Sequence, residues 1–245
     1  MAIAFDNANS VSGTSVSNLT TSAWTIAGSD RLLVAGMGWG DGTPGNYTAI
    51  KWGGSGGTSL TQVGSTVAGG SFHKVAMARL IAPTAASQTL YGEISAAAAA
   101  MAVGGVSFTG VDQTTPLGTS ATNSGTGSDT TFTPTVNVSS ATGEVVIDIA
   151  YGGSDDGTGT TLTISAGTGQ TMRWEQESIA TFDAGTMSTE AGAATVTMSH
   201  TFTFNNFQPW AWGIIGVGIK EAAAGAAAPG WGKLLAGHRN RMVVH

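Results

Sequence analysis

Short runs of β-branched and aromatic residues recur along the whole chain, and clusters of Gly, Asn, Asp and Ser separate them. Runs of this kind form strands, and clusters of this kind form turns. No stretch keeps apolar residues at the helical spacing i, i+3, i+4, i+7 together with capping residues. The sequence therefore predicts an all-β fold. The expected strands are Ile3–Phe5, Ser22–Ile26, Arg31–Trp39, Ala49–Trp52, Thr58–Gly64, His73–Leu80, Gln88–Ile94, Met101–Thr109, Thr130–Val138, Glu144–Tyr151, Leu162–Ile164, Gln170–Gln176, Phe182–Thr186, Ala194–Phe204 and Trp210–Lys220.

So many short strands in one chain indicate two sheets packed face to face, a β-sandwich that we expect to be jelly-roll-like. Ala96–Ala100 favours a helix by propensity, but strand-like segments flank it, so we expect a strand or a bulge there. Gly118–Asp129 is polar and flexible, and is either a long exposed loop or a domain boundary. We favour the loop because neither flank contains a closed set of strands, which makes residues 1–220 one β-sandwich body.

The strand pattern ends at Lys220, and residues 221–245 have a different composition. A linker of small residues, Ala222–Ala228, precedes an end that combines apolar and basic residues without any acidic residue. A merely disordered tail would be polar. We therefore expect an extended C-terminal arm that docks on an acidic surface with an apolar groove; the alternative is a last strand with a frayed end. The expected docking residues are Trp231, Lys233, Leu234, Leu235, Arg239 and Arg241.

Composition restricts the partners of the chain. Charged residues are 10% of the sequence, against about 25% in an ordinary soluble domain. The surface must therefore be covered by Thr, Ser, Asn and Gly, which suits dense packing against other proteins. The net charge of −6 argues against nucleic acid as a partner. The most apolar stretch, Trp210–Ala228, is interrupted by Lys220-Glu221, so we expect no membrane span.

The first seven residues, MAIAFDN, do not show the basic, apolar and cleavage regions of a secretory signal. The body nevertheless looks like that of an extracellular β-protein. A virus particle assembled in the host cytoplasm and released by lysis reconciles the two observations, so a virion location is expected.

Two glycine-rich segments match the residue pattern of a catalytic or nucleotide-binding motif but lack its structural context. Gly40–Gly45 fits G-x-G-x-x-G and Gly53–Gly57 fits G-x-S-x-G, but no helix follows either segment to complete the site. Both are expected to be turns. His73 and His200 lie in strand contexts without metal-ligand spacing, so we expect hydrogen-bonded surface or core residues.

The acidic residues offer two weak sites. Asp155 and Asp156 in a Gly-rich loop are a candidate Ca²⁺ site, with a solvated turn as the favoured alternative. Glu175 and Glu177 lie two residues apart on one strand face, where they fit either a glycosidase pair or an edge ion pair with Arg173. With no Cys in the chain, thiol chemistry is excluded. We expect no enzyme and no cofactor.

Aromatic residues are the remaining candidates for a binding site. Trp39, Tyr47 and Trp52 cluster along one Gly-rich hairpin, and Trp210 and Trp212 lie two residues apart on one strand. Exposed rings can stack on sugars or form the centre of a protein interface. Burial in the core of the protein is the alternative, and we expect it for at least three of the five.

Three segments together resemble β-sandwich proteins that are common in tailed phages: Ile3–Asp6, Ser29–Val34 and Phe108–Pro116. These proteins include capsid cement or decoration proteins and other head- or tail-associated components. The resemblance spans roughly residues 1–220 and rests on structural motifs, so it implies a virion context more than a particular task.

The first hypothesis is a non-enzymatic structural virion protein that cements or decorates a phage capsid. It would bind the major capsid protein or other virion proteins through the arm, and its own copies through the sheets, as a homotrimer at a local three-fold. The alternative is a glycan-binding tail-fibre or surface adhesin module that uses the Trp39, Tyr47 and Trp52 group. A carbohydrate-active enzyme would need two opposed carboxylates, which the sequence does not show.

Overall fold

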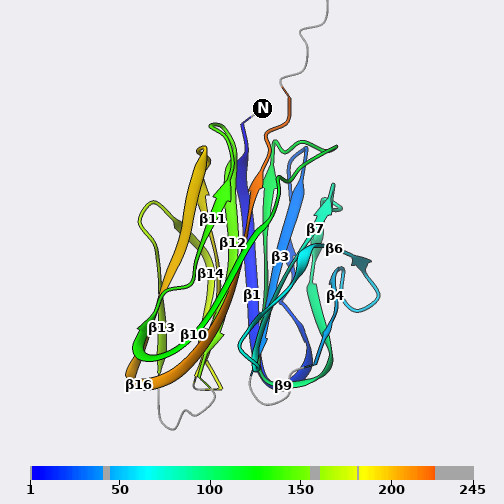
Figure 1. Cartoon of the computed structure of the whole chain (residues 1–245). Helices are drawn as coiled ribbons and strands as arrows, with labels where there is room; N and C mark the ends of the chain where they lie inside the picture. The colour runs from blue at the N-terminus through cyan, green and yellow to red at the C-terminus, as the bar shows by residue number, and fades with distance from the viewer. Residues whose placement is uncertain (1, 41–44, 155–160, 181, 224–245) are drawn as a thin grey trace, which may run out of the picture.

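The computed structural model describes residues 2–40, 45–154, 161–180 and 182–223 (Figure 1). These ranges contain strands and no helix, which confirms the all-β prediction, and so none of their elements is a helix able to cross a membrane. The strands are β1 (Ala4–Thr20), β2 (Trp24–Thr25), β3 (Leu32–Gly40), β4 (Tyr47–Trp52), β5 (Thr58–Ser59), β6 (Thr61–Gly69), β7 (His73–Ile81), β8 (Ser87–Gln88), β9 (Leu90–Thr109), β10 (Ala121–Phe132), β11 (Thr135–Ser139), β12 (Val145–Gly153), β13 (Leu162–Ala166), β14 (Thr171–Ile179), β15 (Asp183–Ala191) and β16 (Thr195–Ile219).

The strands form two large sheets that face each other, as in a β-sandwich (Figure 1). One sheet has the order β5-β4-β9-β3-β7-β6, with β1 also paired to β9. The other has the order β10-β16-β12-β15-β14, with β11 and β13 also paired to β16. Each sheet uses one continuous half of the chain, which we call the N-terminal half (β1–β9) and the C-terminal half (β10–β16). Because the chain does not alternate between the sheets, the expected jelly-roll arrangement is not confirmed.

Two expectations about the middle of the chain need correction. Gly118–Asp129 is not a long loop, since most of it belongs to strand β10. Each flank of this segment also builds its own sheet, whereas neither flank was expected to hold a closed set of strands. Ala96–Ala100 is strand, as expected, and joins the runs on either side into the 20-residue β9.

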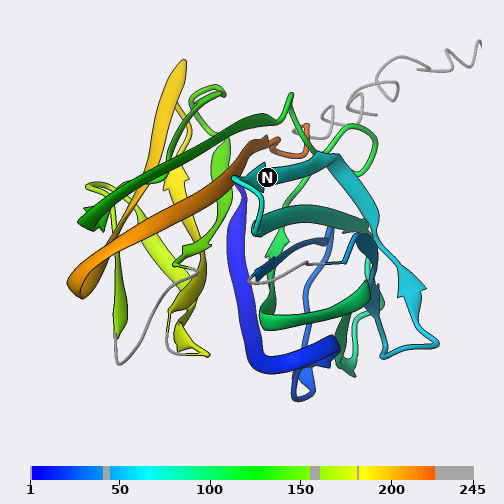
Figure 2. The same cartoon turned by 60° about the horizontal axis from the view of Figure 1, so that its bottom comes forward.

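Three apolar clusters stabilise this arrangement. One lies between the sheets and combines residues of both halves, among them Met77 and Ile215. The second lies inside the curled N-terminal sheet and includes Trp39, and the third lies inside the curled C-terminal sheet and includes Phe202. Figure 2 shows both halves curling around their own interiors. Each half therefore buries a core of its own, and the surface between the halves buries another.

The two halves share one topology. In both, the strand order is the same: β4-β9-β3-β7-β6 matches β13-β16-β12-β15-β14, with β1 and β10 added at equivalent places. Three matched pairs of strands, β3 with β12, β6 with β14 and β7 with β15, have nine residues in every member. The registers also match: Leu32 lies between Ile81 and Phe108, and Val145 lies between Ala191 and Ile219.

Equivalent residues of the two halves meet across the space between the sheets. From the register, Gly36 is equivalent to Ile149 and Gly38 to Tyr151. A Cβ atom at Gly36 would lie 2.6 Å from Cδ1 of Ile149, and one at Gly38 would overlap the side chain of Tyr151. Large residues of β12 thus fill the gaps left by glycines of β3. Contacts between equivalent positions require a pseudo-two-fold axis that runs along the strands, between the sheets.

Asparagine and aspartate side chains cover the outer edges of β1 and β10, which are equivalent strands. In β1, the side-chain oxygens of Asn7 and Asn9 accept hydrogen bonds from the N–H groups of the residues that follow them, both at 2.9 Å. In β10, Asn123 and Asp129 do the same for the next residue, at 2.9 Å and 2.6 Å. At these four positions a side-chain oxygen occupies the edge donor that another strand would use.

Candidate functional site

A shallow groove of about 450 Å³ lies where the turn between β6 and β7 meets β10 and β16. Its described walls are Gly70–Phe72, Thr126–Ser128 and Pro209–Ala211, and we call it the Trp210 groove. None of these residues is charged. Aromatic, aliphatic and hydroxyl groups are what the groove offers a ligand, which suits binding and does not suit acid–base chemistry.

Local packing explains the shape of the groove. In the β10–β16 register, Gly127 lies opposite Trp210, and a Cβ atom at Gly127 would lie 2.5 Å from the indole ring. The same ring stacks on Phe132 at a centroid distance of 5.3 Å and an angle of 24°. Gly70 has a φ of 61°, which lets the β6–β7 turn approach β10 closely. The half-buried indole therefore packs against the core of the C-terminal half, and Trp210 forms part of the groove wall.

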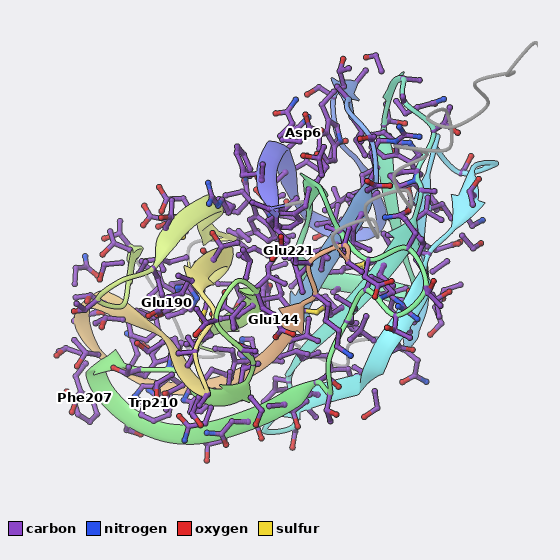
Figure 3. The ribbon with its side chains drawn as sticks, turned by 90° about the horizontal axis from the view of Figure 1, so that it is seen from above. Asp6, Glu144, Glu190, Phe207, Trp210 and Glu221 are labelled. Atoms are coloured by element: carbon purple, nitrogen blue, oxygen red, sulfur yellow. The ribbon has the colours of Figure 1, made fainter. Side chains whose placement is uncertain are left out.

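Among the described residues, three large hydrophobic side chains are exposed: Phe5, Phe72 and Phe207. Two of them belong to this region. Phe72, 39% exposed, lines the groove, and Phe207, 66% exposed, precedes Pro209 by two residues on β16. Figure 3 shows Phe207 and Trp210 near each other, and both lie in the middle part of β16. Phe5 lies on β1 with the Arg173 guanidinium 4.2 Å from its ring centroid.

The aromatic residues singled out from the sequence are mostly buried, as expected for at least three of the five. Trp39 and Trp52 belong to the core of the N-terminal half, and Trp212 belongs to that of the C-terminal half. Tyr47 and Trp210 are half-buried. Burial also raises the pKa of the Tyr47 hydroxyl. The Trp39, Tyr47 and Trp52 group therefore offers no open ring pair for stacking on a sugar.

Sequence reasoning missed Phe72 and Phe207. No periodic signal identifies either one, because an exposed Phe beside Gly, Asn and Pro looks the same in sequence as a turn residue that packs inward. Whether each one is exposed depends on the tertiary packing around the β6–β7 turn and the middle of β16, which the local sequence does not report.

Both histidines in strand contexts are buried and hydrogen-bonded, as predicted. His73 Nε2 lies 2.6 Å from Asp183 Oδ1, and His200 Nε2 lies 2.7 Å from Asp148 Oδ2. Asp148 Oδ1 also accepts hydrogen bonds from the N–H and the hydroxyl of Ser188. His73 and Asp183 are equivalent positions of the two halves, so this pair lies at the pseudo-two-fold axis. All of these groups are closed off from solvent, which indicates a structural role.

Glu175 and Glu177 lie together on the exposed face of β14, as their spacing predicts. Partial desolvation, and then the negative charge of Glu177, raise the pKa of Glu175. Glu177 accepts a hydrogen bond from the N–H of Ile164 at 2.5 Å. Glycoside hydrolysis requires two carboxylates that flank the substrate from opposite sides. Two carboxylates on one strand face do not provide this arrangement.

The other candidate sites have different outcomes. Gly53–Gly57 forms the turn between β4 and β5, as expected. Four of the six residues of Gly40–Gly45 lie outside the described part, and so do Asp155 and Asp156 and the whole docking arm from Trp231 to Arg241. Within the described residues, no group of three or more His, Asp or Glu side chains could hold a metal ion.

Searches with this chain found no match among protein-family models, among curated proteins or among solved structures.

Proposed function

We propose that the chain is a non-enzymatic structural protein of a tailed-phage particle, which cements or decorates the capsid through protein–protein contacts. The observation that carries the proposal is an uncharged groove lined by the exposed Phe72, with the exposed Phe207 two residues along the chain from Pro209 in its wall. Protein interfaces are enriched in aromatic residues and depleted in charge at their centres. The groove has both properties.

The rest of the described surface supports this role. Its hydrogen-bonding groups belong mainly to Thr, Ser and Asn, and charged residues are 10% of the whole chain. Such a surface packs closely against neighbours without strong charge repulsion. The basic and apolar arm, with Trp231 and Arg239 among its residues, is the proposed second contact, made with the major capsid protein or another virion protein.

Binding to capsids that lack this chain tests the proposal. The full chain is mixed with such capsids, and its occupancy is measured by sedimentation. We expect saturable binding, a lower occupancy for Phe72→Ser, and normal occupancy for Phe5→Ser, an exposed Phe of β1 that does not line the groove. A chain that ends at Ala228 should lose most of its occupancy. If it binds normally, the arm has no docking role, and if the full chain does not bind at all, the proposal is wrong.

A glycan-binding tail-fibre or adhesin module is the second candidate. Hydroxyl groups of Ser71, Thr126 and Ser128 border the groove beside Phe72, and this mixture of hydroxyls and a ring suits a neutral sugar. A glycan array separates the two candidates: a reproducible hit that Phe72→Ala abolishes would favour the adhesin, and the absence of any hit would favour the capsid protein.

A further inference from the structure

The two halves of the chain face each other through equivalent positions that carry unlike residues. Gly38 lies against the ring of Tyr151, and the His73 imidazole lies 2.6 Å from the Asp183 carboxylate. In each pair, a position of the N-terminal half meets its own equivalent in the C-terminal half. Two identical halves could not make these contacts.

A second pair of contacts shows that both halves follow the pseudo-two-fold axis closely. The register makes Val75 equivalent to Gly185, and Ala102 equivalent to Gly213. A Cβ atom at Gly213 would lie 2.9 Å from Cγ1 of Val75, and one at Gly185 would lie 3.3 Å from Cβ of Ala102. The rotation that relates the halves therefore turns one contact into the other. Two residues exchanged between facing equivalent positions should consequently face each other again.

The same arrangement disfavours the pairing of two C-terminal halves. Two rings of Tyr151 would meet at the axis, where one ring already leaves no room for a Cβ atom at Gly38. Two Asp183 carboxylates would share a buried site, in which they could not both stay charged. Overpacking and charge repulsion therefore both oppose this pairing.

The pairing of two N-terminal halves is disfavoured for the opposite reason. Gly36 and Gly38 would face copies of themselves, so the volume that Ile149 and Tyr151 fill would be empty. Empty volume in an apolar core weakens packing. Two His73 imidazoles would also meet in place of an imidazole and a carboxylate. The facing surfaces thus select the unlike half.

The contact between the halves does not need the peptide link between them. Among the described strands, the chain passes from one half to the other once, through Gly110–Ser120. The turn at Thr114 and Thr115 in this connection is exposed. Each half has its own apolar cluster, and a third cluster combines residues of both. Packing between the surfaces is therefore available to stabilise the pair.

We propose that the facing surface of each half is a binding site for the unlike half only, and that it keeps this partner when the connection is cut. The partner is a segment of the same fold whose large side chains fill the space over Gly36 and Gly38, and which carries a carboxylate opposite His73. This specificity belongs to the folded body and does not depend on the proposed function.

Cutting the connection in the folded full chain tests the binding. A site for a specific protease is inserted between Thr114 and Thr115, and the cut protein is diluted and analysed by native mass spectrometry. We expect one particle that contains one fragment of each kind. Cut copies with and without isotope labels are then mixed and warmed. Labelled N-terminal fragments should exchange onto unlabelled C-terminal fragments, without complexes of two like fragments.

Exchanging facing residues tests the two-fold geometry in the uncut chain. Gly38→Tyr and Tyr151→Gly should each lower the midpoint of urea unfolding, the first by overpacking and the second by leaving a cavity. The double variant should recover about half or more of the combined loss, because the ring returns to the same space from the other half. Tyr151→Gly combined with Gly56→Tyr is the matched control and should recover nothing, since Gly56 has open space around it.

The buried polar pair allows the same test without a change in packing volume as large as that of a ring. His73→Asp should lower the urea midpoint, because two carboxylates then face each other. Adding Asp183→His should restore much of the loss, because the exchange recreates an imidazole and a carboxylate at the axis.

Three results would overturn the inference. Fragments that separate as soon as the connection is cut have no binding surface for each other. Complexes of like fragments that are as abundant as those of unlike fragments would show that the surfaces do not discriminate. Double variants no more stable than Gly38→Tyr or His73→Asp alone would show that the facing positions are not related by the two-fold rotation.

Discussion

Asp148→Ala should be among the most destabilising single substitutions in the chain. Asp148 is fully buried and accepts three hydrogen bonds. Two come from the N–H and the hydroxyl of Ser188, at 2.9 Å and 3.0 Å, and one comes from His200 at 2.7 Å. Alanine leaves all three donors without this acceptor in a region that water does not reach.

The magnitude follows from the cost of unsatisfied buried groups. Each of the three orphaned buried donors costs about 1–3 kcal/mol. We therefore expect Asp148→Ala to lower the free energy of unfolding by about 4 kcal/mol. For a chain of this size that corresponds to a fall in Tm of about 8–16 °C. Asp148→Asn should cost about half as much, since one oxygen can still accept from Ser188.

Urea unfolding, followed by tryptophan fluorescence, measures both variants against the wild type. Asp129→Ala is the control, because it removes the same group from an exposed edge strand and should change stability by less than about 0.5 kcal/mol. If Asp148→Ala falls within about 1 kcal/mol of Asp129→Ala, the buried network contributes little. The assignment of His200 and Asp148 to a structural role would then be wrong.

Three other substitutions have expected outcomes. Gly38→Ala should cost about 3 kcal/mol in urea unfolding, because its Cβ overlaps the facing sheet, whereas Gly56→Ala, with open space around it, should be neutral. Glu175→Gln should stabilise the protein at pH 7, because the raised pKa of Glu175 means that the folded state disfavours its negative charge. The gain in stability should vanish below pH 4.5, where the carboxyl of the wild type is protonated in both states. Asp112→Asn should destabilise the protein at pH 7, because two backbone hydrogen bonds favour the charged carboxylate of the folded state and lower the pKa of Asp112. The difference in the free energy of unfolding from the wild type should shrink as the pH falls below 3.8 and should disappear below the pKa of the folded state.

The pattern of apolar residues was enough to predict the strands but not their extent. Runs such as Ala194–Phe204 and Trp210–Lys220 were expected as separate strands, yet both belong to β16. Between the two runs, β10 pairs with Gln208 and Pro209, and residues 205–207 fall in a register break that the strand nevertheless crosses. Periodicity detects a strand with one buried face. It cannot detect a polar segment that becomes a strand by pairing with a neighbour.

The duplication was also invisible in the sequence. Equivalent positions carry different residues, such as Gly38 and Tyr151, because each half must complement the other and not itself. The duplication can be recognised from strand order and register, which are known only once the sheets are assembled. The Trp210 groove was missed for the same reason, although Trp210 itself had been singled out. Trp39 and Trp52, singled out as possible glycan-binding rings, are buried, and the expectation that at least three of the five aromatics are buried did not specify which ones.

The side chains along the edges of β1 and β10 affect both the aggregation of the protein and its chemical stability during storage. Lysine is one common protection of an open edge, but β1 and β10 contain none, and side-chain oxygens of Asn and Asp occupy edge donors instead. Asn9 also donates from its amide nitrogen to the carbonyl oxygen of Ser22, and Asn123 donates to that of Thr135. Deamidation would keep the acceptor on each edge and delete this second bond. Slow chemical change over months of storage should therefore loosen the neighbouring segments before it opens an edge to fibril growth.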